Sequence, residues 1–509
     1  MNHFKTAAVL LVGTSSILTT NSLMAGIEVY PFTDPSNYTE SDQSLTDIHI
    51  GLGRLAVIHS PHDIPGDIHA SRDAAIGDFN NDGNNDIYST CAYNSCDKLY
   101  LGDGTGGFTT NNVATPTFVN HFRVSASDFN GDGNLDVYIS TFGYVSENTL
   151  LLGDGQGAFV ANNIPGDMSN ASDLVVGDFN NDNNQDLYVA NFAGPSSNGQ
   201  NSLLLGAGGG SFVTANIQGD TGSTTAVTTA DFNNDGNLDL FTNYPNRIYF
   251  GDGTGSFPTS VTHNALFQSF AVTSGDFNSD NKADLYVART GGVNELYFGD
   301  GTGGFTLSNA MSNIAQSFDV NANDFNDDGY LDLYVANNGQ NKMYLGDGNG
   351  SFSSNDIIGD LGPSFAVNSG DLNNDGIADI YISNDQAGYQ NRLYLSGYST
   401  LAPSIQANIP FDFTTPLTDF IEILSPNNEG KVVYQFSLDY GVTWKFYDGT
   451  GWSDTAQTDG SEANLAYELN SAVMDSLAPS GSVIWRAYLL SDGTQKVEID
   501  TIIIANRQP

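Results

Sequence analysis

The sequence predicts an all-β protein, and three observations carry that prediction. One nonapeptide recurs seven times between residues 78 and 379, β-rich runs follow every copy, and glycine-rich segments of hairpin-turn composition follow most copies. The composition agrees, because 56 Gly, only 16 Pro and 11% aromatic residues among 509 are typical of neither a collagen-like chain nor a disordered acidic tail. A chain of this length predicts two or more domains.

The chain is strongly acidic. With 59 Asp and Glu against 15 Lys and Arg, its formal net charge is −44. A negative field of this size repels phosphate backbones and acidic membrane surfaces, so the charge disfavours a nucleic-acid partner. Acids at fixed spacing indicate metal ligands, whereas evenly spread acids only solvate the surface. The distribution of the acidic residues therefore decides how they are interpreted.

Residues 1–25 have the pattern of a signal peptide. Lys5 precedes a short apolar run, and small and polar residues lead to Ala25. A short buried helix is the alternative, and the terminal position of the run disfavours it. No later stretch is long enough to cross a membrane, so we expect no transmembrane segment in the mature chain. These features predict a secreted protein, extracellular or associated with the cell surface, with the periplasm as the alternative compartment.

The two cysteines, Cys91 and Cys96, lie five residues apart. In an oxidising compartment this spacing predicts a local disulfide that pins a loop. A metal site would need more soft ligands than the chain has, and nothing in the sequence motivates a catalytic thiol.

The nonapeptide is nearly invariant. Its copies begin at Asp78, Asp128, Asp178, Asp231, Asp276, Asp324 and Asp371, at intervals of 45 to 53 residues. Asp occupies positions 1, 5 and 9 in every copy, and Asn occupies position 3. Position 6 is Gly in five copies, and Asn183 or Asn281 in the other two. Intervals that vary this little predict one supersecondary unit with loops of differing length.

Each nonapeptide lies between strand-like segments. In the first copy, residues 74–77 precede it, Ile87-Tyr88 follows it, and residues 98–101 lead into a Gly-Asp-Gly-Thr-Gly-Gly-Phe turn that precedes a fourth strand. Four strands in each of seven units predict a seven-bladed β-propeller over residues 52–397. The seventh unit lacks the fourth strand, so residues 53–60 are expected to supply it and leave the ring without an open edge.

The nonapeptide has the chemistry of a calcium loop. Hard cations such as Ca²⁺ take six to eight oxygen ligands on a tight loop, with a residue that tolerates left-handed backbone at the sharp bend. Oxygen side chains at positions 1, 3, 5 and 9, with a backbone carbonyl at position 7, meet that demand. The absence of nitrogen and sulfur ligands in the loop argues against zinc or copper. The alternative is an Asx-rich turn that caps its own backbone, which seven identical copies disfavour.

With its Asp-Phe-Asn-x-Asp-Gly-x-x-Asp and Gly-Asp-Gly-x-Gly-x-Phe motifs, the sequence resembles the FG-GAP repeats of integrin α-subunit propellers and their exported bacterial VCBS-type relatives. The resemblance implies one Ca²⁺ per blade, up to seven, held by positions 1, 3, 5, 7 (through its carbonyl) and 9. The implied ligands are Asp78, Asn80, Asp82, Asn84, Asp86; Asp128, Asn130, Asp132, Asn134, Asp136; Asp178, Asn180, Asp182, Asn184, Asp186; Asp231, Asn233, Asp235, Asn237, Asp239; Asp276, Asn278, Asp280, Lys282, Asp284; Asp324, Asn326, Asp328, Tyr330, Asp332; and Asp371, Asn373, Asp375, Ile377, Asp379.

A partner would bind on the other face of the propeller. The links between strands 2 and 3 of each blade lie opposite the calcium loops and vary in sequence, and function concentrates in variable loops on a rigid scaffold. An aromatic-lined surface there suits a glycan or an extracellular or cell-surface protein. The candidate ligand-binding residues are Tyr93, Tyr144, Phe192, Tyr244, Arg289 and Tyr389. Phe270, Phe318 and Phe365, which recur before the first strands, are assigned to packing between blades.

The favoured function is a non-catalytic adhesion or recognition module, because the family implies such roles and no nucleophile, phosphate-loop or metalloprotease motif is present. The alternative is a polysaccharide lyase on the same frame. Its acid and base would come from histidines such as His121 and His263, but no repeated spacing or partner constellation supports them.

The repeat ends near residue 397. Residues 26–51 are expected to form an N-terminal segment and residues 398–412 a proline-containing linker. Residues 413–509 hold all three Trp and several strand-like runs, which predict a β-sandwich accessory domain. A carbohydrate site at Trp452 is one interpretation, and a core role is the other.

Overall fold

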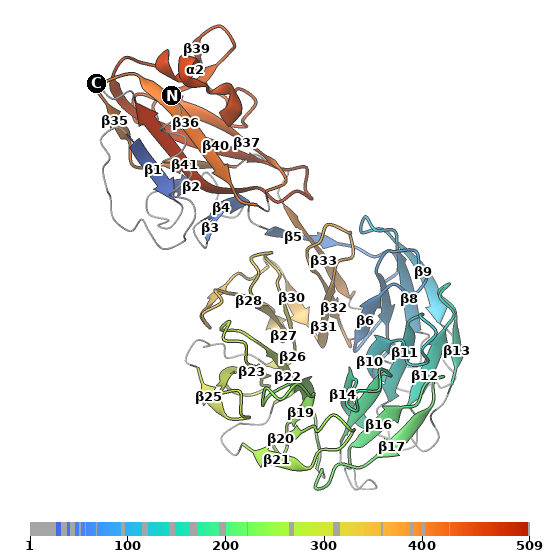
Figure 1. The fold of residues 1–509 in the computed structure, drawn as a ribbon. Helices are drawn as coiled ribbons and strands as arrows, with labels where there is room; N and C mark the ends of the chain where they lie inside the picture. The colour runs from blue at the N-terminus through green and yellow to red at the C-terminus, as the bar shows by residue number, and fades with distance from the viewer. Residues whose placement is uncertain are drawn as a thin grey trace. The chain divides into compact units, whose positions relative to one another are not determined.

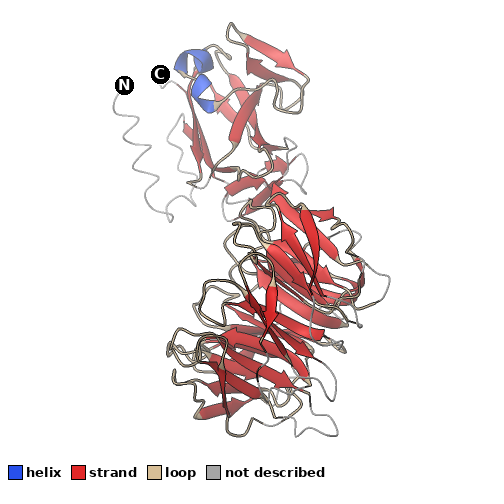
Figure 2. Ribbon diagram, turned by 90° about the vertical axis from the view of Figure 1, so that its right-hand side faces the viewer, coloured by secondary structure: helices blue, strands red, loops and turns tan. Residues whose placement is uncertain are grey.

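The protein is all-β and divides into two compact units, which are described separately. In the computed structural model the ring comprises His59–Ser396, and the terminal unit comprises Met1–Ile58 with Gly397–Pro509. Helix is confined in the described residues to η2 (Ala466–Glu468) and α2 (Ser471–Asp475), both in the terminal unit (Figure 2). The described residues are 27–31, 38–40, 46–49, 52–55, 57–67, 69–92, 97–113, 121–141, 148–162, 164, 170–192, 200–220, 222–263, 269–308, 316–357, 360–386, 390–398, 403–426 and 428–506.

In the described residues, the ring consists of seven antiparallel sheets of four strands, one of which carries an extra strand, β30 (Figure 1). Their strands, in sheet order, are β6 (Ala74–Gly77), β7 (Asp86–Ser89), β8 (Asp97–Gly102), β9 (Phe108–Val113); β10 (His121–Ser127), β11 (Asp136–Thr141), β12 (Thr149–Gly153), β13 (Phe159–Ala161); β14 (Ala171–Gly177), β15 (Asp186–Asn191), β16 (Ser202–Gly206), β17 (Phe212–Ala215); β18 (Val227–Ala230), β19 (Asp239–Thr242), β20 (Arg247–Phe250), β21 (Thr259–Thr262); β22 (Ala271–Gly275), β23 (Asp284–Ala288), β24 (Glu295–Gly299), β25 (Phe305–Leu307); β26 (Ser317–Asn323), β27 (Asp332–Gln340), β28 (Lys342–Gly346), β29 (Phe352–Ser354) with β30 (Leu361–Pro363); and β31 (Ala366–Gly370), β32 (Asp379–Ser383), β33 (Arg392–Tyr398), β5 (Val57–His62).

Successive sheets pack through the repeated phenylalanines. Phe79, at position 2 of the first nonapeptide, lies 6.0 Å in ring-centroid distance from Phe159, which follows the glycine turn of the next sheet. The same pairing joins Phe179 to Phe257 at 6.0 Å. These pairs line apolar clusters between neighbouring sheets. The two phenylalanines of the repeat therefore contribute to the core between sheets, which explains why they recur at fixed positions.

The sheets close a propeller-like ring (Figure 1). The first strand of each sheet contacts the first strand of the next, from β6 through β10, β14, β18, β22 and β26 to β31, and β31 contacts β6. The last sheet takes its outer strand from β5, before the first nonapeptide. We expected residues 53–60 in this role, but the structure gives Val57–His62, and β4 (Leu52–Leu55) pairs with β41 in the terminal unit.

The described residues of the terminal unit form two antiparallel sheets. One joins β1 (Ile27–Pro31), β41 (Glu498–Asn506), β4 and β3 (Thr46–His49), with β36 (Leu417–Leu424) also on β41. The other joins β2 (Tyr38–Glu40), β34 (Ser404–Ala407), β40 (Gly481–Leu490), β37 (Lys431–Ser437), β38 (Trp444–Tyr447) and β39 (Trp452–Thr455), with β35 (Phe411–Phe413) also on β40. Its core includes the fully buried Trp485 and Tyr434.

Two expected boundaries differ from this arrangement. Residues 26–51 were expected to be a separate segment, yet strands β1, β2 and β3 belong to the sheets of the terminal unit. Residues 398–412 were expected to be a linker, yet they contain β34 and part of β35, both paired with β40. These pairings join residues far apart in the chain, from Phe411 with Val483 to Ile27 with Ala505, and they leave no local sequence signal. Chain order alone therefore misplaced both segments.

Residues 1–25, the expected signal peptide, lie outside the described residues. The longest helix among the described residues, α2, has five residues, and none of these residues form a candidate membrane-spanning helix.

Candidate metal loops and the axial cluster

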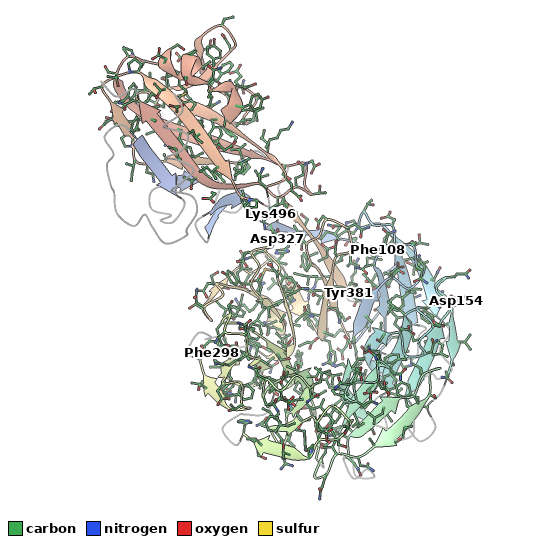
Figure 3. The ribbon with its side chains drawn as sticks, in the orientation of Figure 1. Phe108, Asp154, Phe298, Asp327, Tyr381 and Lys496 are labelled. Atoms are coloured by element: carbon green, nitrogen blue, oxygen red, sulfur yellow. The ribbon has the colours of Figure 1, made fainter. Side chains whose placement is uncertain are left out.

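All seven nonapeptides form the same loop between the first and second strands of a sheet. Two residues in each loop have left-handed backbone. At position 6 these are Gly83, Gly133, Asn183, Gly236, Asn281, Gly329 and Gly376, and at position 4 they are Asn81, Gly131, Asn181, Asn234, Ser279, Asp327 and Asn374 (Asp327 is labelled in Figure 3). The bend at position 6 was expected, and Asn183 and Asn281 adopt it as Gly does. The bend at position 4 was missed, although six of the seven residues there are Asn, Gly or Asp, which tolerate it, and Ser279 is the exception.

These bends turn successive backbone N–H groups into the loop. In the first copy, Asp78 Oδ1 accepts from the N–H of Asp82 at 3.1 Å, and Asp78 Oδ2 accepts from the N–H of Gly83 at 2.8 Å. Asn80 Oδ1 also accepts from the N–H of Asp82, at 3.0 Å, and Asp82 Oδ1 accepts from that of Asn84 at 2.9 Å. Equivalent bonds occur in the fifth copy, where position 6 is Asn. Positions 1, 3 and 5 are therefore held close together on one side of the loop.

The Asp at position 9 ties the loop to the sheet. Asp239 is fully buried, and its two oxygens accept from the N–H groups of Phe232 and Gly251, each at 2.9 Å. Burial raises its pKa to about 6, and the nearby carboxylates of Asp235 and Asp231 add to the rise. The position-9 residues of the other six sheets make the same two bonds.

The chemistry of the loop residues fits a hard cation. Each loop presents carboxylate and amide oxygens at positions 1, 3 and 5, and the position-9 carboxylate behind them is penalised by burial and by like charge. A divalent cation would offset that repulsion. The same hydrogen bonds also make each loop an Asx-rich turn, which was the alternative interpretation. Among the described residues, no three acidic, histidine or cysteine side chains converge closely enough to form a complete metal site by themselves.

Neighbouring loops are also joined directly. The side-chain amide of Asn81 donates to Asn134 Oδ1 in the next sheet at 2.7 Å. Asn374 in the last sheet donates to Asn84 Oδ1 in the first at 2.7 Å. The loops therefore reinforce the closure of the ring.

A charged cluster that sequence reasoning missed lies at the centre of the ring. Arg123 on β10 is almost fully buried, with Nε 3.6 Å from Asp173 Oδ1 and Nη1 3.8 Å from Asp319 Oδ2. Asp73, also buried, faces the same guanidinium. Each of these carboxylates additionally accepts a backbone N–H from the next sheet, as Asp73 does from Val124 at 3.0 Å. The signal was present, because all four residues stand five positions before a nonapeptide.

Burial has the largest effect on the pKa values of the residues in this cluster. It raises the pKa of Asp73 to about 7 and that of Asp173 to about 6, against the opposing effect of Arg123. Burial lowers the pKa of Arg123, but the attraction of Asp319, Asp173 and Asp73 outweighs it and leaves that pKa raised. One guanidinium therefore neutralises part of a buried acidic group drawn from three other sheets.

Four phenylalanines lie one position earlier, around the same axis. Phe318 stacks on Phe365 at 6.0 Å and meets Phe270 edge-on at 5.7 Å. Phe122 meets Phe365 edge-on at 5.6 Å, although their strands are not in neighbouring sheets, and the guanidinium of Arg72 lies 5.4 Å from the Phe122 ring. The rings thus converge on the axis, beyond the packing between adjacent blades that we expected. Because each first strand runs toward its nonapeptide, this aromatic cluster lies at the end of the ring opposite the loops.

The predicted ligand-binding residues are only partly described. Phe192 and Tyr244 are 39% and 51% exposed, and Tyr244 has left-handed backbone. Arg289 is less available, because Nη1 pairs with Glu295 Oε1 at 3.3 Å. Tyr93, Tyr144 and Tyr389 lie outside the described residues, as does Cys96, so the predicted disulfide also falls outside them; Cys91 is buried.

The two histidines proposed for a lyase are not brought together. His121 is buried on β10, with Nδ1 2.9 Å from Asp97 Oδ1. His263 follows β21, two sheets away, and its ring lies 5.2 Å from that of Phe305. Burial lowers the pKa of His263.

Comparison with known proteins supports the repeat assignment. A model of the FG-GAP-like repeat matches residues 62–139, 185–242 and 324–382. No curated protein matches the sequence. Among solved structures, the chain is similar to an Agrocybe aegerita lectin described as recognising non-reducing terminal N-acetylglucosamine, with 14% identity over 63% of this chain and 87% of that chain and a TM-score of 0.45. It is also similar to BBS1N from a complex with ARL6DN (11% identity, 66% and 97% coverage, TM-score 0.45) and to YCF48 from Cyanidioschyzon merolae (11%, 67% and 98%, TM-score 0.41). Similarity this distant carries no argument about ligands.

Proposed function

Since the chain is an FG-GAP repeat protein, we propose that it is an exported, calcium-stabilised, seven-bladed β-propeller that acts as a recognition module for a glycan or an extracellular or cell-surface protein. The observation that carries the proposal is the sevenfold loop, with the same two left-handed bends and the same three Asp in every copy. A local turn does not need three carboxylates in each copy, because Asn or Ser caps backbone groups equally well without mutual repulsion.

In this proposal one Ca²⁺ per loop is held by positions 1, 3 and 5, the carbonyl of position 7 and the carboxylate of position 9. Binding places positive charge between carboxylates that otherwise repel one another, and so stabilises the folded ring. A cation that binds only the folded state adds about 2.7 kcal/mol per site when its concentration is 100 times Kd. Several loops acting together therefore give a large dependence of stability on calcium.

The test is thermal unfolding of the full chain with calcium and with excess EGTA, together with calorimetric titration of Ca²⁺. We expect EGTA to lower the melting temperature and added Ca²⁺ to restore it. The variant Asp82→Asn should remove one binding equivalent. Its control is Asp103→Asn, which makes the same charge change in the glycine turn, where the carboxylate only caps Thr105 and Gly107. An unchanged melting temperature after complete chelation would contradict the calcium proposal.

Recognition is assigned to the end of the ring opposite the loops. Phe192 and Tyr244 are large aromatic side chains that this end leaves exposed, and the axial phenylalanines lie at the same end. Aromatic side chains on a rigid scaffold supply contact area at low entropic cost, for a sugar ring or for an apolar patch of a protein.

We would measure binding on a glycan array and to intact cells, in calcium. The variants Phe192→Asn and Tyr244→Asn should reduce binding about tenfold or more, since central aromatic contacts dominate such interfaces. Asn is chosen because it tolerates the left-handed backbone of Tyr244. The control is Val213→Asn, which removes an exposed apolar side chain from the outer strand β17. Equal losses in all three variants, or none, would reject this surface.

A further inference from the structure

The terminal unit contains a cavity of about 410 Å³ that the proposed function does not use. It lies between the β38–β39 hairpin and the short helix α2. The hairpin contributes Tyr447, Thr450, Gly451 and Trp452 to its walls, and α2 and its C-terminal cap contribute Ala472 and Ser476. Ligand cavities in proteins commonly measure about 300–1,000 Å³, so this one suits a ligand of one or two sugar rings.

Trp452 forms a fixed aromatic wall of the cavity. Its indole Nε1–H donates to the carbonyl of Val473 and to Ser476 Oγ, both at 3.2 Å. The ring meets Phe436 edge-on at 5.7 Å and Tyr447 at 5.9 Å. These contacts hold the indole in one orientation while leaving it partly exposed. A ligand that stacks on it does not have to order the ring first.

The turn that precedes Trp452 is also fixed before any ligand binds. Asp448 Oδ1 accepts from the backbone N–H and the hydroxyl of Thr450, at 2.8 and 2.7 Å, and from the N–H of Gly451 at 2.9 Å. The Thr450 hydroxyl therefore donates inside the turn and remains an acceptor toward the cavity. The Ser476 hydroxyl also donates inside the protein, to the carbonyl of Val473 at 2.7 Å, and it accepts from Trp452 Nε1, which leaves one lone pair for a ligand.

The polar groups of the cavity are uncharged and include both hydrogen-bond donors and hydrogen-bond acceptors. Thr450 and Ser476 offer acceptors, and the hydroxyl of Tyr447 has no partner among the described residues and can donate. All lining residues are uncharged, although the chain has a net charge of −44. An anionic ligand would find no counter-charge here, and a cationic one no carboxylate in the wall. The lining suits a neutral molecule with an apolar face and several hydroxyls.

We propose that this cavity binds a neutral sugar residue of an oligosaccharide, with an apolar face of the sugar ring against Trp452 and its hydroxyls bonded to Tyr447, Thr450 and Ser476. The site is independent of the recognition surface proposed for the ring. A second site of this kind would let one chain bind a polymeric glycan at two places, which increases avidity without new contacts at either site.

The test titrates the full chain with neutral oligosaccharides built from glucose (β-1,4 and α-1,4 linked) or N-acetylglucosamine, and with oligogalacturonate as the anionic comparison. Binding is followed by calorimetry and by tryptophan fluorescence. We expect a Kd in the micromolar to millimolar range, about −4 to −8 kcal/mol, for at least one neutral series. Tyr447→Phe, which removes one hydroxyl, should weaken that binding several-fold.

Two variants fill the cavity without removing a contact. Ala472 is exposed, and a Cβ added to Gly451 meets no atom within 4 Å, so Ala472→Arg and Gly451→Leu should fold normally. Each should weaken binding at least tenfold. The control is Ala456→Arg, an equally exposed alanine outside the cavity.

Three results would overturn the proposal: no neutral series binds at about 10 mM, well above the weakest expected Kd; oligogalacturonate binds more tightly; or the filling variants bind normally. Phe192→Asn and Tyr244→Asn should leave this binding unchanged, so the two proposals fail separately.

Discussion

Arg123 Nη1 lies 3.8 Å from Asp319 Oδ2, although β10 and β26 belong to sheets that are not neighbours in the ring. The pair crosses the axis, and the edge-on contact between Phe122 and Phe365 crosses it one position earlier in the chain. Contacts of this kind restrain the ring as a whole, whereas the apolar clusters restrain only adjacent sheets.

Replacing Arg123 should therefore destabilise the ring strongly. Arg123→Met keeps much of the side-chain volume but leaves three buried carboxylates without their counter-charge, which typically costs about 3–5 kcal/mol. The free energy of unfolding in urea, measured in calcium, tests this. Arg247→Met is the control, because Arg247 lies on β20 and bonds mainly to Thr262 and Gly219 near the surface. A variant as stable as the wild type would show that the guanidinium contributes nothing net.

The same cluster should make the stability of the folded ring depend on pH in an unusual way. The pKa of Asp73 in the folded protein is about 7, above its ordinary value of 3.8, so the folded state holds a proton that the unfolded state has already released. The stabilisation from this proton is complete below about pH 4 and is lost as pH rises through 7.

Asp73→Asn mimics the protonated acid and isolates this effect from Asp173, Asp319 and the loop carboxylates. Relative to the wild type, the variant should gain stability between pH 5 and pH 8, by about 1 kcal/mol or more. The measurement is urea unfolding across this range at saturating calcium. If the free energies of unfolding of the two proteins differ by the same amount at every pH, Asp73 does not titrate in this range.

Within a nonapeptide, position 9 should matter more than position 5 when no calcium is present. Asp239→Ala leaves the N–H groups of Phe232 and Gly251 without acceptors inside the protein, at about 1–3 kcal/mol for each buried group. Asp235→Ala removes an exposed side chain whose partners can bond to water. Unfolding measured in EGTA should show a larger loss of stability for Asp239→Ala than for Asp235→Ala. A larger loss for Asp235→Ala would contradict the structural role of position 9.

The first glycine of each glycine turn should resist substitution for a steric reason. A Cβ on Gly251 would lie 2.2 Å from the carbonyl oxygen of Leu238, a backbone atom that cannot move aside. Gly251→Ala should therefore destabilise the ring by about 1–3 kcal/mol, as overpacking generally does. Gly291→Ala is the matched control, since a Cβ there meets nothing within 4 Å. Thermal unfolding of both variants distinguishes close contact from the general effect of losing a glycine.

The repeat made the local structure predictable. Each nonapeptide lies between two strands of one sheet, as expected, because hydrophobic periodicity and turn composition act over a few residues. The left-handed bend at position 6 of the nonapeptide could be predicted for the same reason. The bend at position 4 could also have been predicted, because that position carries Asn, Gly, Ser or Asp in every copy.

Contacts between distant segments were harder to predict. Arg123 contacts Asp319 because the ring brings their strands to one axis. Their shared position five residues before a nonapeptide places them at the same level of their strands, but it does not show that strands of non-neighbouring sheets meet there. The pairing of β1 with β41 joins the two ends of the chain in the same way. Residue type did give a partial signal, since a lone Arg at a position held elsewhere by Asp or Ala calls for a nearby counter-charge.

The outer strand of the last sheet has a consequence for biosynthesis. His59 Nδ1 lies 2.9 Å from Ser396 Oγ, a contact between residues 337 positions apart. Strand β5 is therefore synthesised long before β33, and it remains unpaired until almost the whole ring has left the ribosome. Such a high contact order predicts slow folding and an exposed strand edge during the delay. Because the ring begins and ends in one sheet, its two chain ends lie side by side. A circular permutant can therefore join these two ends and open a surface loop elsewhere. Such a ring should complete each sheet in the order in which the sheets are synthesised.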